Sequence, residues 1–148
     1  MYTIEEFDRE KTKILKYILY KKRSENEVRN KFSSTINQEL LEDIIDYLKE
    51  ANYINDKEFI EKTVNNFITL KNLSLKELKY KLMSIGLNKD DIDDYLYENK
   101  EELEEYEIKS ASNIIYKKSS TMEQEEIKQY LLKKGYKNEN IKQAFENE

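Results

Sequence analysis

The apolar residues of this chain recur at helical spacing, and one set of them returns about fifty residues further on. In the clearest copy, Leu78 and Leu82 precede Gly86, and Ile92 and Leu96 follow it. The copy that follows begins forty-nine residues later (127 against 78) and has Ile127, Leu131, Gly135, Ile141 and Phe145. The earlier copy has Ile36 where the glycine would be, and its other marks are Val28, Phe32, Ile44 and Leu48. A self-match at a fixed period predicts a repeat protein, here with three copies of one helical unit.

Each copy is expected to hold a longer first helix and two shorter ones. The middle helices should begin where Ser24 precedes Glu27 and Ser74 precedes Glu77. This is the capping-box spacing, in which the serine accepts a hydrogen bond from the third helical N–H and the glutamate reaches back. The other helix starts are expected at Thr3, Asn37, Asn55, Asn88 and, for the last middle helix, Thr121 or Met122.

The longer helices carry apolar inner faces at helical spacing. The first should run to about Lys22, and the acidic residues 98–107 should form a solvated connection into the third. Gly86 and Gly135 follow the middle helices and are expected to hold positive φ. The predicted inner faces are Phe7, Ile14, Leu15, Ile18 and Leu19, then Phe59, Ile60, Val64, Phe67 and Ile68, then Leu103, Ile108, Ala111, Ile114 and Ile115.

The sequence therefore predicts nine helices and no sheet. The chain has no proline and only two glycines, so little interrupts a helix. The predicted fold is all-α, with three tandem three-helix repeats that form an elongated curved array. The expected repeats cover residues 1–53, 54–99 and 100–148.

Composition narrows the possible functions. The net charge is −5, from 26 basic and 31 acidic side chains, and no third of the chain is basic, which does not favour a general nucleic-acid binder. The absence of cysteine excludes disulfides and thiolate metal sites. No long apolar run and no signal peptide are present, so a soluble, cytoplasmic protein with no membrane contact is expected. The protein is also expected to be a monomer.

The residues needed for common catalytic chemistry are missing. Histidine is absent, and the two glycines lie too far apart for a phosphate-binding loop. The acidic cluster at residues 90–94 lacks the glycine and terminal glutamate of a calcium loop, and acidic residues are favourable in the first turn of a helix. The sequence predicts no catalytic residue, no cofactor, no metal and no enzyme activity.

Basic residues recur at one position of each repeat. Arg29, Lys79 and Lys128 each follow the first apolar mark of the middle helix, and Lys31 and Lys81 extend this first row. A second row lies at the ends of the first helices and comprises Lys21, Lys22, Lys71, Lys117 and Lys118, with Arg23 directly after the first pair. Equivalent positions of an array share one face, so both rows are candidate partner-binding residues, although lysines are also common at helix C-termini.

Three stretches carry a resemblance to the RecX family of regulatory proteins. They are residues 23–28, residues 48–59 and residues 78–96, and the likeness extends over about residues 11–147. Tyr53-Ile54-Asn55-Asp56 followed by Phe59 is the most specific piece. The chain departs from the family pattern at Ile60, where a small alanine is usual.

The resemblance implies a protein that regulates the RecA recombinase without being an enzyme. Such proteins lie in the helical groove of the RecA filament on single-stranded DNA and inhibit its recombinase, ATPase and co-protease activities. The expected partner is thus the RecA filament, with indirect or weak contact to single-stranded DNA. Two alternatives stay open: a helical-repeat DNA-binding module and a general protein-interaction scaffold.

Overall fold

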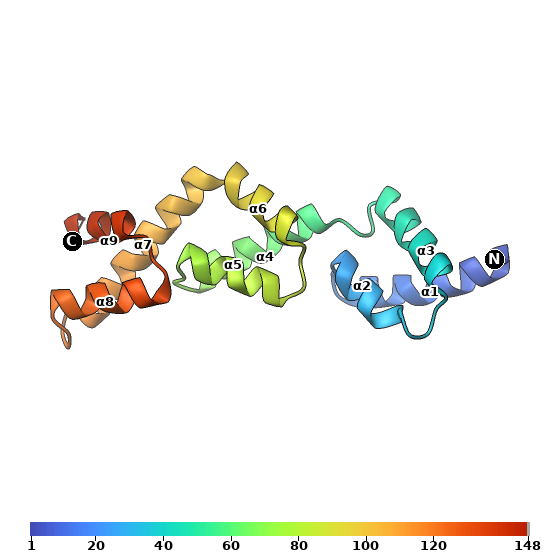
Figure 1. The fold of residues 1–148 in the computed structure, drawn as a ribbon, viewed down its shortest axis with the longest axis horizontal. Coiled ribbons are helices and arrows are strands. Elements are labelled where there is room, and N and C mark those ends of the chain that lie inside the picture. The colour runs from blue at the N-terminus through green and yellow to red at the C-terminus, as the bar shows by residue number, and fades with distance from the viewer. Residues whose placement is uncertain (148) are drawn as a thin grey trace.

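A computed structural model describes residues 1–147, and this range contains nine α helices and no strand. The predicted all-α array of tandem three-helix repeats is confirmed, and the molecule is elongated, with its N-terminus and its last helices at opposite ends (Figure 1). The first repeat holds α1 (Ile4–Tyr20), α2 (Glu25–Phe32) and α3 (Gln38–Glu50). The second holds α4 (Asp56–Leu70), α5 (Leu75–Ser84) and α6 (Lys89–Glu98), and the third holds α7 (Lys100–Lys118), α8 (Gln124–Lys134) and α9 (Asn138–Glu146).

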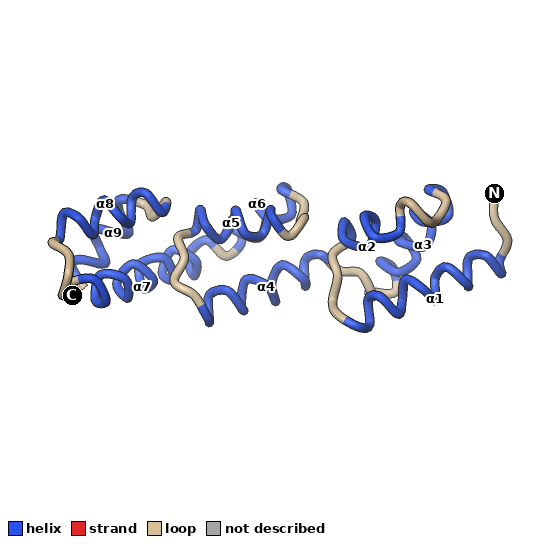
Figure 2. Tube along the Cα trace, turned by 90° about the horizontal axis from the view of Figure 1, so that it is seen from below, coloured by secondary structure: helices blue, strands red, loops and turns tan. Residues whose placement is uncertain are grey.

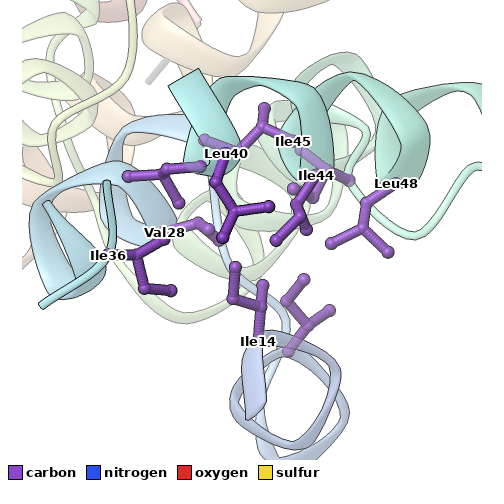
Figure 3. Close-up of a cluster of buried hydrophobic side chains, with 10 residues drawn as sticks. Ile14, Val28, Ile36, Leu40, Ile44, Ile45 and Leu48 are labelled. Atoms are coloured by element: carbon purple, nitrogen blue, oxygen red, sulfur yellow. The ribbon is translucent and has the colours of Figure 1, made fainter. Parts of the chain in front are cut away.

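Each repeat has its own apolar core. In the first, Ile14 of α1 packs with Val28 of α2 and with Ile44 and Leu48 of α3, and all four are fully buried (Figure 3). The fully buried marks of the other two cores are Leu78, Leu82 and Ile92, then Ile127, Leu131 and Ile141. The repeat marks are therefore core positions, with Phe32, Leu96 and Phe145 partly buried at the core edges.

The apolar residues beside the predicted repeat boundaries pack with the preceding core. Ile54 belongs to the first core and Leu103 to the second. The boundaries at residues 53 and 99 themselves stay predictions.

The helix starts follow the polar residues that precede them. Both predicted capping boxes, at Ser24 and Ser74, are present with both of their hydrogen bonds. The side chains of Asn37 and Asn88 accept N–H groups at the starts of α3 and α6. The prediction for α8 is wrong: this helix begins at Gln124 after Glu123, because the N–H groups of residues 121 and 122 are still bonded to the carbonyl of Lys118.

Two further predictions about the long helices are wrong. Leu19 is 71% exposed, because Ile18 is the last buried residue of α1 and the final turn extends beyond the core. The acidic residues 98–107 do not form a connection, since α7 begins at Lys100 and shares Asn99 with the end of α6. Acidic side chains suit the positive end of a helix, so the glutamates favour the start of α7.

Both glycines hold the predicted positive φ, 95° at Gly86 and 97° at Gly135. Each follows the middle helix of its repeat, where a left-handed residue ends the helix at little steric cost. In the first repeat Asn52, just after α3, has φ 64°, a conformation that asparagine tolerates better than most residues.

The middle helices α2, α5 and α8 meet end to end. The side chain of Asn26 at the start of α2 donates to the carbonyl of Gly86 after α5, at 2.7 Å. Ser74 before α5 donates its hydroxyl to the carbonyl of Lys134 at the end of α8, also at 2.7 Å. Figure 2 shows the first helices of the repeats in one row and the shorter helices in another. We call the contact between repeats one and two the first joint, and the contact between repeats two and three the second joint.

Candidate partner-binding surface

Arg29, the first member of the recurrent basic row, is bound by carboxylates of its own repeat. Its Nε and Nη2 donate to the two carboxylate oxygens of Glu42 in α3 at 2.8 and 2.9 Å, and Glu25 lies at 3.3 Å. The hydrogen bond with Glu42 raises the pKa of Arg29, and the same bond lowers the pKa of Glu42. One third of the Arg29 side chain stays exposed. Arg29 therefore joins α2 to α3 and still reaches the surface.

Lys79 repeats this arrangement in the second repeat, and Lys128 does not. The Lys79 ammonium lies 2.8 Å from the carboxylate of Asp93 in α6, and this hydrogen bond lowers the pKa of Asp93. Forty-nine residues after Asp93 the chain has Lys142 (142 against 93), which lines the same cavity as Lys128. No salt bridge within residues 1–147 includes Lys128, so among the three recurrent cations Arg29, Lys79 and Lys128 only the last lacks a carboxylate partner there.

Lys31, Lys81 and Lys118 each lie over an aromatic ring of their own repeat. Lys31 is 5.8 Å from the ring centre of Tyr17, and Lys81 is 5.8 Å from that of Phe67. In these two repeats the lysine is on the middle helix and the ring on the first helix. In the third repeat the lysine is on the first helix instead, and Lys118 lies 4.3 Å from the ring of Tyr130 on the middle helix. Cation–aromatic contacts are attractive, so each repeat fastens its first helix to its middle helix in this way.

The second basic row is less uniform. Lys22 forms a 2.6 Å salt bridge with Glu58 across the first joint. Arg23 stacks 4.0 Å from the ring centre of Tyr17. Lys21 and Lys117 are exposed, and neither enters a salt bridge within the described part of the chain. With Lys128, these two are the predicted contact residues whose charge is least engaged internally.

The second joint is built around a buried carboxylate, that of Glu107 in α7. Its side chain is 0% exposed. One oxygen accepts the backbone N–H of Leu75 at 2.6 Å, and the other accepts the N–H of Lys137 at 2.9 Å and the amide of Asn140 at 2.8 Å. Leu75 begins α5 and Lys137 precedes α9, so one negative charge meets the positive ends of two helices.

Sequence reasoning missed Glu107 because it lies in an acidic run that was expected to be solvated. The signal that could have found it is spacing, since Leu103, Glu107 and Ala111 lie four residues apart on one helix face and all three are buried. At the first joint Asp56 is the counterpart, and it accepts the N–H of Glu25 at 2.8 Å. Partial burial raises the pKa of Asp56.

Neither metal-binding nor membrane-spanning features appear in residues 1–147. No group of three or more acidic side chains in this range is placed to hold a metal ion. No helix within it combines the length and apolar character that crossing a bilayer requires.

No protein-family model matches the chain. Over 138 residues it is 29% identical to the regulatory protein RecX of Staphylococcus carnosus, with 90% of this chain and 51% of that protein covered. Over 139 residues it is 27% identical to the regulatory protein RecX of Clostridioides difficile, with 91% and 66% covered. The chain thus spans between half and two thirds of the length of these two relatives.

Two solved structures share the fold. A crystal structure of RecX from Lactobacillus salivarius matches with a TM-score of 0.82 at 22% identity, covering 98% of this chain and 97% of that one. A crystal structure of a regulatory protein RecX matches with a TM-score of 0.78 at 20% identity, covering 95% and 71%. The resemblance predicted from residues 11–147 is confirmed by the curated relatives, and the fold by both structures.

Proposed function

Since this chain belongs to the RecX family of regulatory proteins, we propose that it binds the RecA recombinase filament on single-stranded DNA. It inhibits the recombinase, ATPase and co-protease activities of that filament and acts as a monomer without enzymatic activity of its own. The observation that carries the proposal is the match to curated RecX proteins over nine tenths of this chain. Tandem repeats joined end to end suit a partner that itself repeats along an axis.

The recurrent basic residues are the proposed contact surface. Arg29 pairs with two carboxylates of its own repeat and Lys79 with one, and both cations stay about one third exposed, whereas Lys128 has no carboxylate partner within residues 1–147. Exposed ion pairs are weak, so a partner carboxylate or phosphate can share these cations. Lys21, Lys22, Arg23, Lys117 and Lys118 form the second proposed contact row, and Lys31 and Lys81 flank the first.

ATP hydrolysis by RecA on single-stranded DNA tests the proposal. The wild-type protein is expected to suppress hydrolysis as its concentration rises. If hydrolysis is unchanged at a concentration well above that of RecA, the chain is not such a regulator. If the chain instead binds bare DNA with steep salt dependence and has no effect on RecA, the DNA-binding alternative holds.

The contact row is tested by removing its charges without adding repulsion. Arg29→Gln and Lys79→Gln keep Glu42 and Asp93 next to neutral amides, whereas glutamate at these positions would repel them. Lys128→Gln removes the third charge in the same way, without adding a carboxylate beside Glu125. Combined, the three changes are expected to weaken inhibition about ten- to a hundredfold, the effect of three modest contacts. If the triple variant still inhibits RecA at the concentration at which the wild type does, the row is not the contact surface.

A further inference from the structure

A groove of about 530 Å³ opens at the second joint, between α5, α6, α7 and the loop before α9. Its apolar part comes from Leu75, Leu96 and Leu103, beside the ring of Tyr97, which is 79% exposed. Four lysines line it as well: Lys76, Lys79, Lys100 and Lys137. The groove therefore combines an apolar lining with a basic rim.

The acidic side chains of the groove are already engaged. Glu107 is bound by three donors, and Glu104 pairs with Lys137 and accepts a hydrogen bond from Asn140. Burial opposes ionisation of Glu104, yet these contacts lower its pKa, so its charge is retained and neutralised locally.

The lysines are not all engaged. Lys76 and Lys100 are exposed, and no salt bridge within residues 1–147 includes either of them. The charge that the groove offers to a ligand is therefore positive.

The first joint provides an internal comparison. Its cavity, about 370 Å³, is mostly polar and carries three carboxylates, those of Glu25, Asp56 and Asp91, against one lysine, Lys49. Holding two repeats together is the same task at both joints. Leu75 packs against the core of the second repeat and Lys137 pairs with Glu104, but packing does not account for Lys76 and Lys100, which are unpaired within residues 1–147.

Three equivalent positions show the change. Leu75 of the second joint replaces Glu25, Lys76 replaces Asn26, and Lys137 replaces Asn88, at offsets of 50, 50 and 49 residues. The second joint has gained one apolar and two basic side chains where the first has polar or acidic ones. These substitutions point to a ligand that is apolar and anionic.

We propose that the groove at the second joint binds an acidic segment of a partner protein that carries an apolar or aromatic side chain. The apolar side chain occupies the space beside Leu96, Leu103 and Tyr97, and the flanking carboxylates meet Lys76 and Lys100. Charge complementarity of this kind selects a partner and its orientation. The inference rests on the proposed function only for which protein supplies the segment.

Nucleic acid fits the groove less well. The chain has a net charge of −5, and Glu104, Glu107 and Asp93 lie in or beside the groove, which repels a continuous polyanion. An acidic peptide places charge at separate points and can supply the apolar side chain between them.

Fluorescence anisotropy with a labelled peptide tests the proposal. The probe is a short peptide with aspartates on both sides of one phenylalanine. Two comparison peptides replace the phenylalanine by serine or the aspartates by asparagines. The probe is expected to bind, more weakly at high salt, and each comparison peptide is expected to bind at least about tenfold more weakly. Equal binding of all three peptides would overturn the proposal.

The groove residues are tested with a matched control. Lys76→Glu with Lys100→Glu should weaken probe binding about tenfold or more. Both positions lie in helix first turns, where glutamate is favourable, so folding should be kept. The control is Lys57→Glu with Lys89→Glu, also in first turns but outside the groove, and it should bind the probe as the wild type does.

Exchanging the charges of the groove and the peptide distinguishes a loss of binding from a loss of stability. The Lys76→Glu, Lys100→Glu variant should bind a peptide with lysines around the phenylalanine better than the wild type does. If single-stranded oligothymidylate displaces the probe and loses affinity in the same variant, the groove is a nucleic-acid site and the proposal fails. Because RecA is absent from this assay, a protein that binds the probe without affecting RecA would refute only the proposed function.

Discussion

The carboxylate of Glu107 accepts the backbone N–H of Leu75 at 2.6 Å across the second joint, although the two residues are 32 positions apart. At the first joint Asp56 accepts the N–H of Glu25 in the same way. Glu107 is fully buried and Asp56 is half-buried, so the same contact is shielded from water at one joint and partly open at the other. The two joints therefore share a hydrogen bond from a backbone N–H to a carboxylate, and they differ in how far this bond is shielded from water.

Removal of the Glu107 carboxylate should strongly destabilise the protein. Glu107→Ala leaves the backbone N–H groups of Leu75 and Lys137 without their acceptor and the Asn140 amide with only Glu104, which should cost on the order of 3–5 kcal/mol. Glu107→Gln should cost less, since one amide oxygen can still accept. Urea unfolding measures both, with exposed Glu105→Gln as the control. If Glu107→Ala lowered the free energy of unfolding no more than the control does, Glu107 would not stabilise the joint.

Leu82 and Leu19 make a matched pair for the core. Leu82 is 0% exposed and Leu19 is 71% exposed, and both are leucines on helices. Leu82→Ala should cost on the order of 2–5 kcal/mol, as other buried leucine truncations do. Leu19→Ala should change the free energy of unfolding by less than about 0.5 kcal/mol. Equal effects in urea unfolding would contradict the assigned core.

The two glycines should differ when a methyl group is added. Both have positive φ, so Gly86→Ala should cost about 1 kcal/mol. At Gly135 the added Cβ would also lie 2.9 Å from Cβ and Cδ of Lys76, whereas nothing lies within 4 Å at Gly86. Gly135→Ala should therefore cost more, and thermal unfolding of both variants measures the difference. If Gly86→Ala lost more stability than Gly135→Ala, the Lys76 side chain would be able to move away from the added methyl group at little cost.

Acid should remove the contribution of Arg29. Its hydrogen bond with Glu42 lowers the pKa of that carboxyl below its ordinary 4.5, so the unfolded chain binds the proton more readily. The pair thus stabilises the protein above about pH 4.5, and this is lost as pH falls through the lowered pKa. Because the pair is partly exposed, Arg29→Gln should cost only about 0.2–1 kcal/mol at neutral pH.

The cost of Arg29→Gln should shrink towards zero in acid. Urea midpoints at neutral pH and at about pH 3 check this, with exposed Lys21→Gln as the control. A constant difference between wild type and Arg29→Gln at both pH values would mean that Glu42 is not the partner that matters.

The sequence by itself determined the helices, the repeat and the cores. Apolar residues at a period of about fifty, with serines and asparagines ahead of them, predicted Leu78, Leu82 and Ile92 as core and Ser24 and Ser74 as caps, and all five have these roles. Periodicity and capping are local properties of the chain. They act within a few residues, so they can be recognised without knowing what lies across the molecule.

Only the tertiary structure decided what the charged residues do. Glu107 looked solvated because its neighbours in sequence are acidic, but the joint brings the starts of α5 and α9 to its carboxylate from about thirty residues away on either side. Arg29 and Lys79 were predicted as partner-binding cations from their recurrence alone, and only the structure shows that the neighbouring helix of each repeat supplies a carboxylate to them. Whether a charge is solvated, paired or buried depends on groups distant in sequence, since electrostatic partners are set by packing and not by local pattern.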